Sequence, residues 1–285
     1  MLEYDSIRTS LSKESMLAEI RMQLSAPQNE NKTFVILEGI DDITMFDSLL
    51  SPTGCILYES YGGKTALNKT VSEAFNDKRI IGIRDIDYDI PLECERIFYC
   101  DHCNAEMMMI ANDSFFISIM RKLIKRKENF LQLRLDVLDC LKYFSFTREQ
   151  NDTNHWGVNL SSTSVEYLIS KNDHIKINDI INHVNIKSNV KIDNQKKIAI
   201  CEAVDNNKKT LLDYTNGHDF CSILKCMIKN KYGLQNTTLT KISDQDFKNF
   251  LSIGYTFDYF TKTVLFDKLK EYQETNFLHI VESRI

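Results

Sequence analysis

Carboxylates follow three of the apolar runs in this sequence, close to the point where each run ends. Glu38 comes directly after the first of these runs, and Asp85 and Asp87 come after another. Glu106 follows the last run by a few residues. If the runs are strands of one parallel sheet, their carboxyl ends meet at the edge where such sheets bind ligands. The four side chains would then belong to one site.

Side chains at positions i and i+2 of an extended segment point to the same side, so Asp85 and Asp87 are expected to reach one site together. Glu38 joins them if the first and third strands are neighbours. Carboxylates that converge without a cation repel one another and take up protons. Mg²⁺ relieves this repulsion because it prefers oxygen ligands, and Mn²⁺ is the alternative ion. We therefore predict Glu38, Asp85, Asp87 and Glu106 as ligands of Mg²⁺, with Glu106 able to hold a second ion of a two-metal phosphoryl-transfer site.

The elements that must position these residues are short strands alternating with helices. This alternation is typical of βαβ units and a parallel sheet, and buried parallel strands appear as continuous apolar runs. Strands are expected at 33–39, 55–60, 80–87 and 96–100. Helices are expected at 12–26, 41–50 (capped by an aspartate), 64–75 and 104–112. The predicted class is therefore α/β.

From about residue 113 the pattern becomes helical. Two long helices are expected at 114–130 and 131–146, followed by an irregular stretch at 147–162. Shorter helices are expected at 164–170, 178–185, 194–206, 219–230 and 244–251. We therefore predict two regions, an α/β metal-binding core with an N-terminal helix over residues 1–112 and a mainly helical, basic region over residues 113–285.

The composition limits the compartment and the possible partners. Among 285 residues, 43% are hydrophobic and 26% charged, which suits a large core. No apolar stretch reaches the roughly 20 residues that span a bilayer, and the first residues lack the pattern of a signal peptide. The eight cysteines are scattered, which indicates reduced, mostly buried thiols. We expect a cytoplasmic protein without membrane contact.

Charge is divided unevenly along the chain. Residues 1–120 contain 10 Lys and Arg against 20 Asp and Glu, whereas residues 121–285 contain 25 against 20. An acidic first half suits cations, and a basic second half suits a polyanion. The segment 121–127 holds five basic residues, and a second basic region contains Lys187, Lys191, Lys196, Lys197, Lys208 and Lys209. With aromatic residues nearby for stacking (Phe130, Tyr143 and Trp156), these regions favour nucleic acid over a merely solvated face.

The acidic pattern resembles a known signature. Glu38-Gly39-x-x-Asp42 on one strand and Asp85-x-Asp87 on a later one are similar to the Toprim motif of topoisomerases, primases and OLD-type nucleases. "YGGKTAL", "NAE", "CLKYFSFTREQNDTNHWGVNLS" and "NGHDFCSILK" extend the resemblance over about residues 30–230. Together they resemble a bacterial family with an OLD-like Toprim core that includes the Toprim effector of the PARIS anti-phage systems.

The resemblance implies a function. A Toprim-like parallel sheet flanked by helices would carry a Mg²⁺-dependent nuclease site in which Glu38, Asp85, Asp87 and Glu106 hold metal. Lys64, from the Gly-Gly loop, would contact the scissile phosphate, with a solvated surface lysine as the alternative. Asn104 matches the acid or amide that family members often show two residues before the last glutamate.

The resemblance also implies partners. Such effectors are held by an ABC-type ATPase, are released when a phage protein is sensed, and cleave host tRNA in abortive infection. Family behaviour suggests a homodimer when active. A DNA substrate is the alternative to RNA. A degenerate Toprim core that docks a partner such as the ATPase is the alternative to an enzyme.

The sequence also contains partial matches to a P-loop and to zinc sites, and three further acids. Gly63-Lys64-Thr65 ends like a P-loop, but the first glycine of that motif falls at Tyr58. Two sets of zinc-ligand types occur, Cys94 with Cys100, His102 and Cys103, and His218 with Cys221 and Cys226; buried thiols are favoured over zinc. Three acids keep open roles: Asp42 as a helix N-cap or a ligand, Asp89 as a turn residue or a ligand, and Asp101 without an assignment.

Overall fold

Four short segments pair as a parallel sheet in the order β2-β1-β3-β4. The strands are β1 (Thr33–Leu37), β2 (Cys55–Glu59), β3 (Ile80–Arg84) and β4 (Ile97–Tyr99). All five residues of β1 and of β3 are buried, as expected for strands covered on both faces. The prediction of an α/β fold with a parallel sheet is therefore confirmed. The condition that the first and third strands are neighbours is also met.

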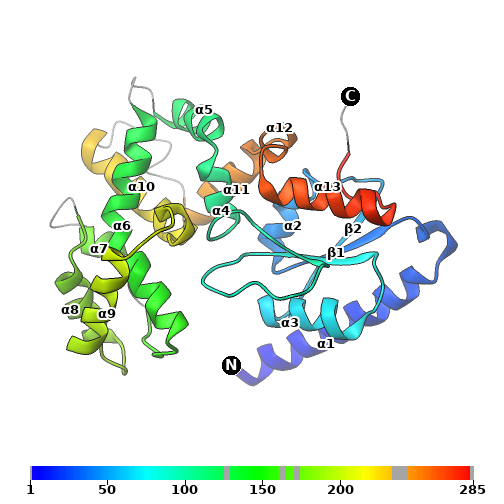
Figure 1. Cartoon of the computed structure of the whole chain (residues 1–285), viewed down its shortest axis with the longest axis horizontal. Coiled ribbons are helices and arrows are strands. Elements are labelled where there is room, and N and C mark those ends of the chain that lie inside the picture. Colours follow the sequence, from blue (N-terminus) through cyan, green and yellow to red (C-terminus); the bar gives the residue numbers. More distant parts are fainter. Residues whose placement is uncertain are drawn as a thin grey trace. The chain divides into compact units, whose positions relative to one another are not determined.

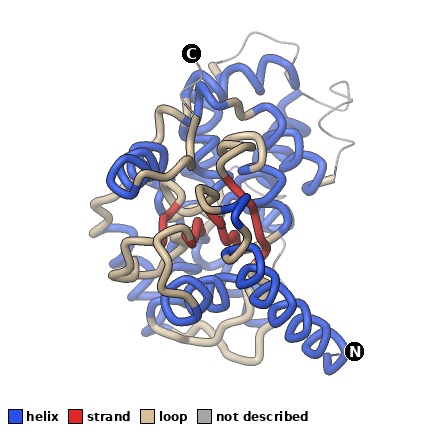
Figure 2. Tube along the Cα trace, turned by 90° about the vertical axis from the view of Figure 1, so that its right-hand side faces the viewer, coloured by secondary structure: helices blue, strands red, loops and turns tan. Residues whose placement is uncertain are grey.

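The computed structural model describes residues 2–124, 129–160, 163, 165–169, 174–232 and 243–282. By contact density the chain divides into two compact units. The first comprises Met1–Ile86, Pro91–Asp101 and Tyr255–Ile285, and the second comprises Asp87–Ile90 and His102–Gly254. Helices dominate the described chain and the strands are short (Figure 2). No helix in these ranges is long and apolar enough to cross a membrane.

The first unit is a sheet with helices on both faces. Its helices are α1 (Leu2–Leu24), α2 (Ile40–Phe46), α3 (Gly63–Lys69, continued by a π-helical turn, Thr70–Ala74), α12 (Phe257–Phe260) and α13 (Val264–Asn276). Figure 1 shows α1 and α3 on one side of the strands and α2 and α13 on the other. A short 3₁₀ turn, Pro27–Asn29, precedes β1.

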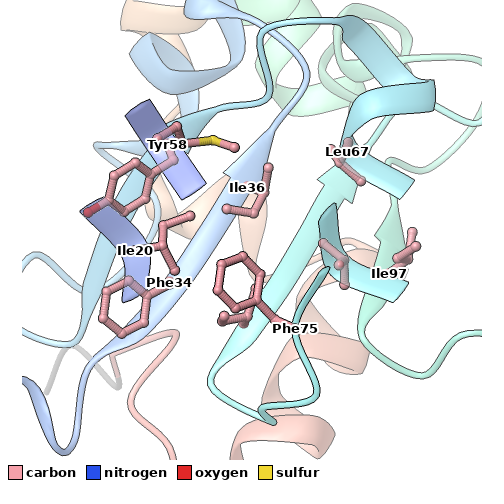
Figure 3. Close-up of a cluster of buried hydrophobic side chains, with 10 residues drawn as sticks. Ile20, Phe34, Ile36, Tyr58, Leu67, Phe75 and Ile97 are labelled. Atoms are coloured by element: carbon pink, nitrogen blue, oxygen red, sulfur yellow. The ribbon is translucent and has the colours of Figure 1, made fainter. Parts of the chain in front are cut away.

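Side chains from α1, α3 and the strands form a closed apolar cluster on one face of the sheet. Ile20, Phe34, Ile36 and Leu67 are fully buried in it (Figure 3). Each such side chain contributes about 1.5–3 kcal/mol relative to an exposed one. This burial fixes the register of β1 and thereby the position of the residue that follows it.

The second unit is helical. It contains α4 (Ala105–Ala111), α5 (Asp113–Leu123), α6 (Phe130–Thr153), α7 (Val165–Ile169), α8 (Ile177–Lys187), α9 (Asn194–Asp205), α10 (Gly217–Tyr232) and α11 (Asp244–Gly254), with a 3₁₀ turn at Leu211–Asp213. The predicted helices of the second half are therefore present. Residues 125–127 of the first basic segment, which hold three of its five basic residues, lie outside the described residues.

Two boundaries differ from the sequence-based expectation. The stretch at 147–162 was expected to be irregular, but α6 continues to Thr153. Phe146 and Thr147 are buried on it, and Arg148 forms a two-pronged pair with Asp219 (2.5 and 3.0 Å). These tertiary contacts outweigh the weak helix propensity of the polar residues. Helix α5 ends at Leu123, earlier than the predicted end at residue 130.

The expected division at residue 112 differs from the observed units, because the C-terminal segment packs on the sheet. Tyr272 of α13 lies edge-on to Phe98 of β4, with ring centroids 5.4 Å apart. Asp101, left without a role in the sequence, accepts hydrogen bonds from the backbone N–H groups of Val264 (2.8 Å) and Leu265 (2.9 Å). A carboxylate at the first turn of a helix satisfies donors that have no partner within the helix and complements its dipole.

We predict that Asp101→Asn lowers the free energy of unfolding by about 1 kcal/mol, because the carboxylate at the start of α13 is lost. Urea unfolding measures the change. Glu274→Gln, which removes an exposed charge from the same helix, should stay within about 0.5 kcal/mol of the parent. The loss should be equal with and without Mg²⁺. A loss that depends on Mg²⁺ would instead make Asp101 a metal ligand.

Candidate functional site

The carboxyl end of β1 places Glu38 beside a buried arginine. Leu37 of β1 pairs with Ile83 of β3. The residues that follow them, Glu38 and Arg84, therefore lie on a common face of the sheet. Oε1 of Glu38 is 3.7 Å from Nε of Arg84, and the two side chains are 22% and 2% exposed. The predicted ligand therefore has a cationic neighbour within the first unit.

Arg84 is held by several groups. Its Nε donates to the backbone carbonyl of Asp85 (2.9 Å), one terminal nitrogen donates to Oδ1 of Asn68 (3.3 Å), and its guanidinium lies over the ring of Tyr99 (5.4 Å). Arg84 was not among the residues predicted for the site. The strand register could have revealed it. Once β1 and β3 are paired, the basic residue at the end of β3 lies beside the residue that follows β1.

Asp85 directly follows β3, and its charge affects the pKa of a buried thiol, Cys100. Cys100 follows β4 and is only 4% exposed. Burial first, and then the negative charges of Asp85 and Asp42, raise the pKa of this thiol well above its usual range. The charges of Asp42 and Asp85 therefore both act on one buried group at the carboxyl edge of the sheet.

Asp42 also organises the start of α2. Helix α2 begins after Gly39, and Oδ2 of Asp42 accepts a hydrogen bond from the backbone N–H of Gly39 (3.1 Å). The expected aspartate N-cap is thus corrected: Gly39 holds the N-cap position and Asp42 reaches back to it from the third position of the helix. This is the reciprocal half of a capping box.

The expectation that Asp85 and Asp87 share one side of an extended strand is wrong. Strand β3 ends at Arg84, and Asp87 lies in a turn with a left-handed φ of 47°. Asp tolerates this conformation better than most residues do. The turn is held by a hydrogen bond from the Asp87 N–H to the carbonyl of Cys103 (2.8 Å) within the second unit. Asp87 is partly buried.

Glu106 has its own cationic partner in the second unit. It lies in the first turn of α4, and its Oε1 is 2.6 Å from Nζ of Lys248 on α11; the side chains are 14% and 9% exposed. Nε2 of His218, at the start of α10, is 2.5 Å from the same Nζ. Because an ammonium has no acceptor, Lys248 donates to both partners, and His218 accepts through Nε2.

The local sequence explains how Glu106 is enclosed. Asn104 caps α4 by accepting from the N–H of Met107 (3.1 Å). Gly217 packs so closely that a Cβ there would lie 2.5 Å from Cβ of Glu106 and 2.9 Å from Oδ1 of Asn104. Only glycine fits without a shift, which gives the "NGHD" segment a physical role. Nothing in the local sequence singles out Lys248, and His218 was expected only as a candidate zinc ligand.

Lys64 occupies the second position of α3, after the Tyr-Gly-Gly loop that ends β2, and is partly buried. That loop is tied to β1: the Ser60 N–H donates to the carbonyl of Leu37 (2.9 Å), and its Oγ donates to the carbonyl of Glu38 (3.1 Å). The loop that precedes Lys64 is therefore hydrogen-bonded to the backbone of Leu37 and Glu38 within the first unit.

Of the predicted ligands, Glu38 and Asp85 belong to the first unit, and Asp87 and Glu106 belong to the second. Among the described residues, no group of three or more His, Cys, Asp or Glu side chains is arranged to hold one ion. All eight cysteines are free thiols; four are buried and four are partly buried.

The second basic region also carries structural duties. Nζ of Lys191 donates to the carbonyls of Asn185 (2.5 Å) and Ser188 (2.8 Å), and Nζ of Lys196 donates to the carbonyl of Lys191 (2.9 Å). Lys187, Lys208 and Lys209 are exposed. Of the aromatic residues suggested for base stacking, Phe130 is buried, whereas Tyr143 and Trp156 are partly buried.

Comparisons of the chain with protein-family models, with curated proteins and with solved structures gave no match.

We predict that Cys100 resists alkylation by iodoacetamide at pH 8 in the folded protein. The thiolate is the reactive form, and burial together with Asp85 and Asp42 keeps this thiol protonated. Mass spectrometry of cysteine-containing peptides should show modification first at partly buried thiols such as Cys94 and Cys201, and at all eight after unfolding. Labelling of Cys100 at the rate of Cys201 would contradict this account.

We also predict that Lys248→Met lowers the free energy of unfolding by about 3 kcal/mol, because the enclosed carboxylate of Glu106 loses its counter-charge. The double variant Glu106→Gln/Lys248→Met should lose clearly less than the sum of the two single variants. Lys229→Met, on the exposed face of α10, serves as the control and should change little. Urea unfolding measures all four, and additive losses would show that the two side chains are not coupled.

Proposed function

We propose that the chain is a divalent-metal-dependent nuclease with a Toprim-like core. The observation that carries the proposal is the placement of two acids at the ends of neighbouring parallel strands. Glu38 directly follows β1, Asp85 directly follows β3, and the two strands are paired. The negative charges of Asp85 and Asp42 both raise the pKa of the buried thiol of Cys100. Open parallel sheets bind ligands at this edge.

The donor set fits a hard cation. The candidate ligands Glu38, Asp85, Asp87 and Glu106 are all carboxylates, the ligand type that Mg²⁺ and Mn²⁺ prefer. They are partly buried, which strengthens their attraction for a cation. When bound, such an ion supplies a Lewis acid that activates water and stabilises the leaving oxygen. Arg84 and Lys248 are the internal cations with which the ion competes at Glu38 and Glu106.

The protein's own groups would orient the substrate. Arg84 is buried and held by Asn68 and the backbone of Asp85, so it keeps Glu38 at the sheet edge. Lys64, after the Gly-Gly loop, supplies a positive charge for a substrate phosphate. The exposed lysines of the second basic region would contact the phosphate backbone of a long substrate, and binding should then weaken as salt rises.

RNA, and tRNA in particular, is the substrate we propose, as the toxic activity of an anti-phage abortive-infection effector. This part of the proposal rests on the resemblance described above, as do an ABC-type ATPase partner and an active homodimer. Incubation of the protein with total RNA and Mg²⁺, followed by sequencing of new RNA ends, tests it directly. New ends confined to tRNA support the proposal. If the protein cleaves DNA in a parallel incubation and leaves RNA intact, the substrate is DNA.

We predict that Glu38→Gln abolishes cleavage and leaves the fold intact. The substitution keeps the volume of the side chain but removes the charge that binds the cation. Arg84 loses part of its charge compensation, so a small loss of stability is expected without metal. Mg²⁺ should raise the melting temperature of the parent more than that of the variant, since ligand binding to the native state adds RT ln(1 + [L]/Kd).

Glu59→Gln is the matched control. Glu59 ends the neighbouring strand β2 and pairs with Leu37 in the register, yet it is not one of the candidate ligands. The control should cleave RNA and respond to Mg²⁺ as the parent does. A Glu38→Gln protein that still cleaves would limit Glu38 to a structural role at the strand end.

A second candidate function has one specific observation in its favour. Glu38 and Glu106 each lie beside a buried basic side chain, Arg84 and Lys248, as would suit a core that no longer needs a metal and docks a protein partner. Thermal melting in a titration of Mg²⁺ or Mn²⁺ separates the two. A concentration-dependent rise favours the nuclease, and no response up to millimolar metal favours the docking module.

A further inference from the structure

Tyr61 has a backbone conformation that its residue type disfavours. Its φ is 50° in the loop that follows β2. A positive φ places Cβ against the following carbonyl in any residue except glycine, so the position favours glycine or asparagine. Glycines occupy the next two positions, Gly62 and Gly63. Between Ser60, whose hydroxyl bonds to the backbone, and these two glycines, Tyr61 carries a large side chain at a place where a side chain costs stability.

The fold makes little use of the Tyr61 ring. The residue is 37% exposed. Within the described residues, its side chain forms no hydrogen bond and its ring stacks on no other ring. An unfavourable backbone retained for a side chain that forms no hydrogen bond and no ring contact points to a use outside the fold.

The loop is fixed next to a predicted ligand. The Ser60 hydroxyl donates to the carbonyls of Glu38 and Gly63, each at 3.1 Å, and this ties both ends of the loop to the end of β1. A Cβ on Gly62 would lie 2.8 Å from Cβ of Ala66, so the loop packs closely on the first turn of α3. Tyr61 thus stands at the carboxyl edge of the sheet on a rigid support.

We propose that Tyr61 is a stacking platform for an unpaired nucleobase of the substrate, and this proposal rests on the nuclease function proposed above. An aromatic face stacks on any base, and only unpaired bases expose their faces. Lys64, three residues later at the start of α3, supplies the charge that a neighbouring phosphate needs. The Tyr61 ring would contact the base of a nucleotide, and the Lys64 ammonium would contact its phosphate. The loop therefore selects single-stranded segments.

Two substitutions separate the ring from the backbone. Tyr61→Phe keeps the ring and the unfavourable conformation. Tyr61→Asn removes the ring and suits the positive φ, so its melting temperature should equal or exceed that of the parent. Tyr167→Ala, which removes an exposed tyrosine from α7 in the other unit, is the control for loss of an aromatic side chain.

Binding is measured by fluorescence anisotropy with a single-stranded RNA oligonucleotide of mixed sequence and with the same strand annealed to its complement. All proteins carry Glu38→Gln so that the RNA stays intact. Tyr61→Asn should weaken single-strand binding about five-fold or more, the size of one lost base-stacking contact. Duplex binding should stay unchanged. Tyr61→Phe and Tyr167→Ala should bind both RNAs as the Glu38→Gln protein does.

The outcomes distinguish the two proposals. If Tyr61→Asn binds the single strand as tightly as its reference, or weakens both RNAs equally, the stacking role is wrong and the nuclease function stands. If the parent protein binds no nucleic acid and cleaves none in total RNA, the nuclease function fails, and the stacking role fails with it. A Tyr61→Asn protein that melts below the parent would show that the ring serves the fold.

Discussion

The complete burial of β1 constrains everything around it. This strand lies between β2 and β3, and all five of its side chains are buried, so no charged group fits along its length. After the buried Thr33 at its start the strand is apolar, and the first charged side chain appears where the strand leaves the sheet, at Glu38. β3 is likewise buried from Ile80 to Arg84, and its one charged side chain, Arg84, is its last residue. Burial of the two central strands therefore concentrates charge at their carboxyl ends.

Charges concentrated at an edge must be compensated, and the compensation differs between residues. Glu38 has the guanidinium of Arg84, Asp42 has the N–H of Gly39, and Glu106 has the ammonium of Lys248. Asp101 is neutralised by the start of α13, which also explains why the C-terminal helices return to the first unit. Asp42 and Asp101 thus serve the starts of helices, whereas Glu38 and Glu106 each lie beside a cationic side chain.

The sequence predicted the features that depend on local pattern. Apolar runs identified the four strands, and parallel pairing followed from their alternation with helices. It did not predict the turn at Asp87, because a left-handed φ there depends on a hydrogen bond to Cys103. Nor did it predict the full length of α6 or the pairing of Glu106 with Lys248, which lies 142 residues later in the chain. Contacts of that range leave no periodic signal, and only the register of β1 and β3 makes the partner of Glu38 predictable.

The two internal cations are not equivalent, and the difference bears on how a metal ion would compete with them. Arg84 is anchored by Asn68, by the backbone of Asp85 and by the ring of Tyr99, so it keeps its place whether or not a second cation reaches Glu38. Its Nε lies 3.7 Å from the carboxylate of Glu38, beyond a close hydrogen bond.

Lys248, in contrast, contacts Glu106 directly at 2.6 Å. Its long flexible stem and single point charge allow it to move away, but only by giving up that contact and the one to His218. Under the proposed function, a divalent ion would therefore compete with the more distant Arg84 at Glu38 and with a direct contact of Lys248 at Glu106. On these contacts, the acids of the first unit should bind an ion first, and binding at Glu106 should cost the rearrangement of Lys248.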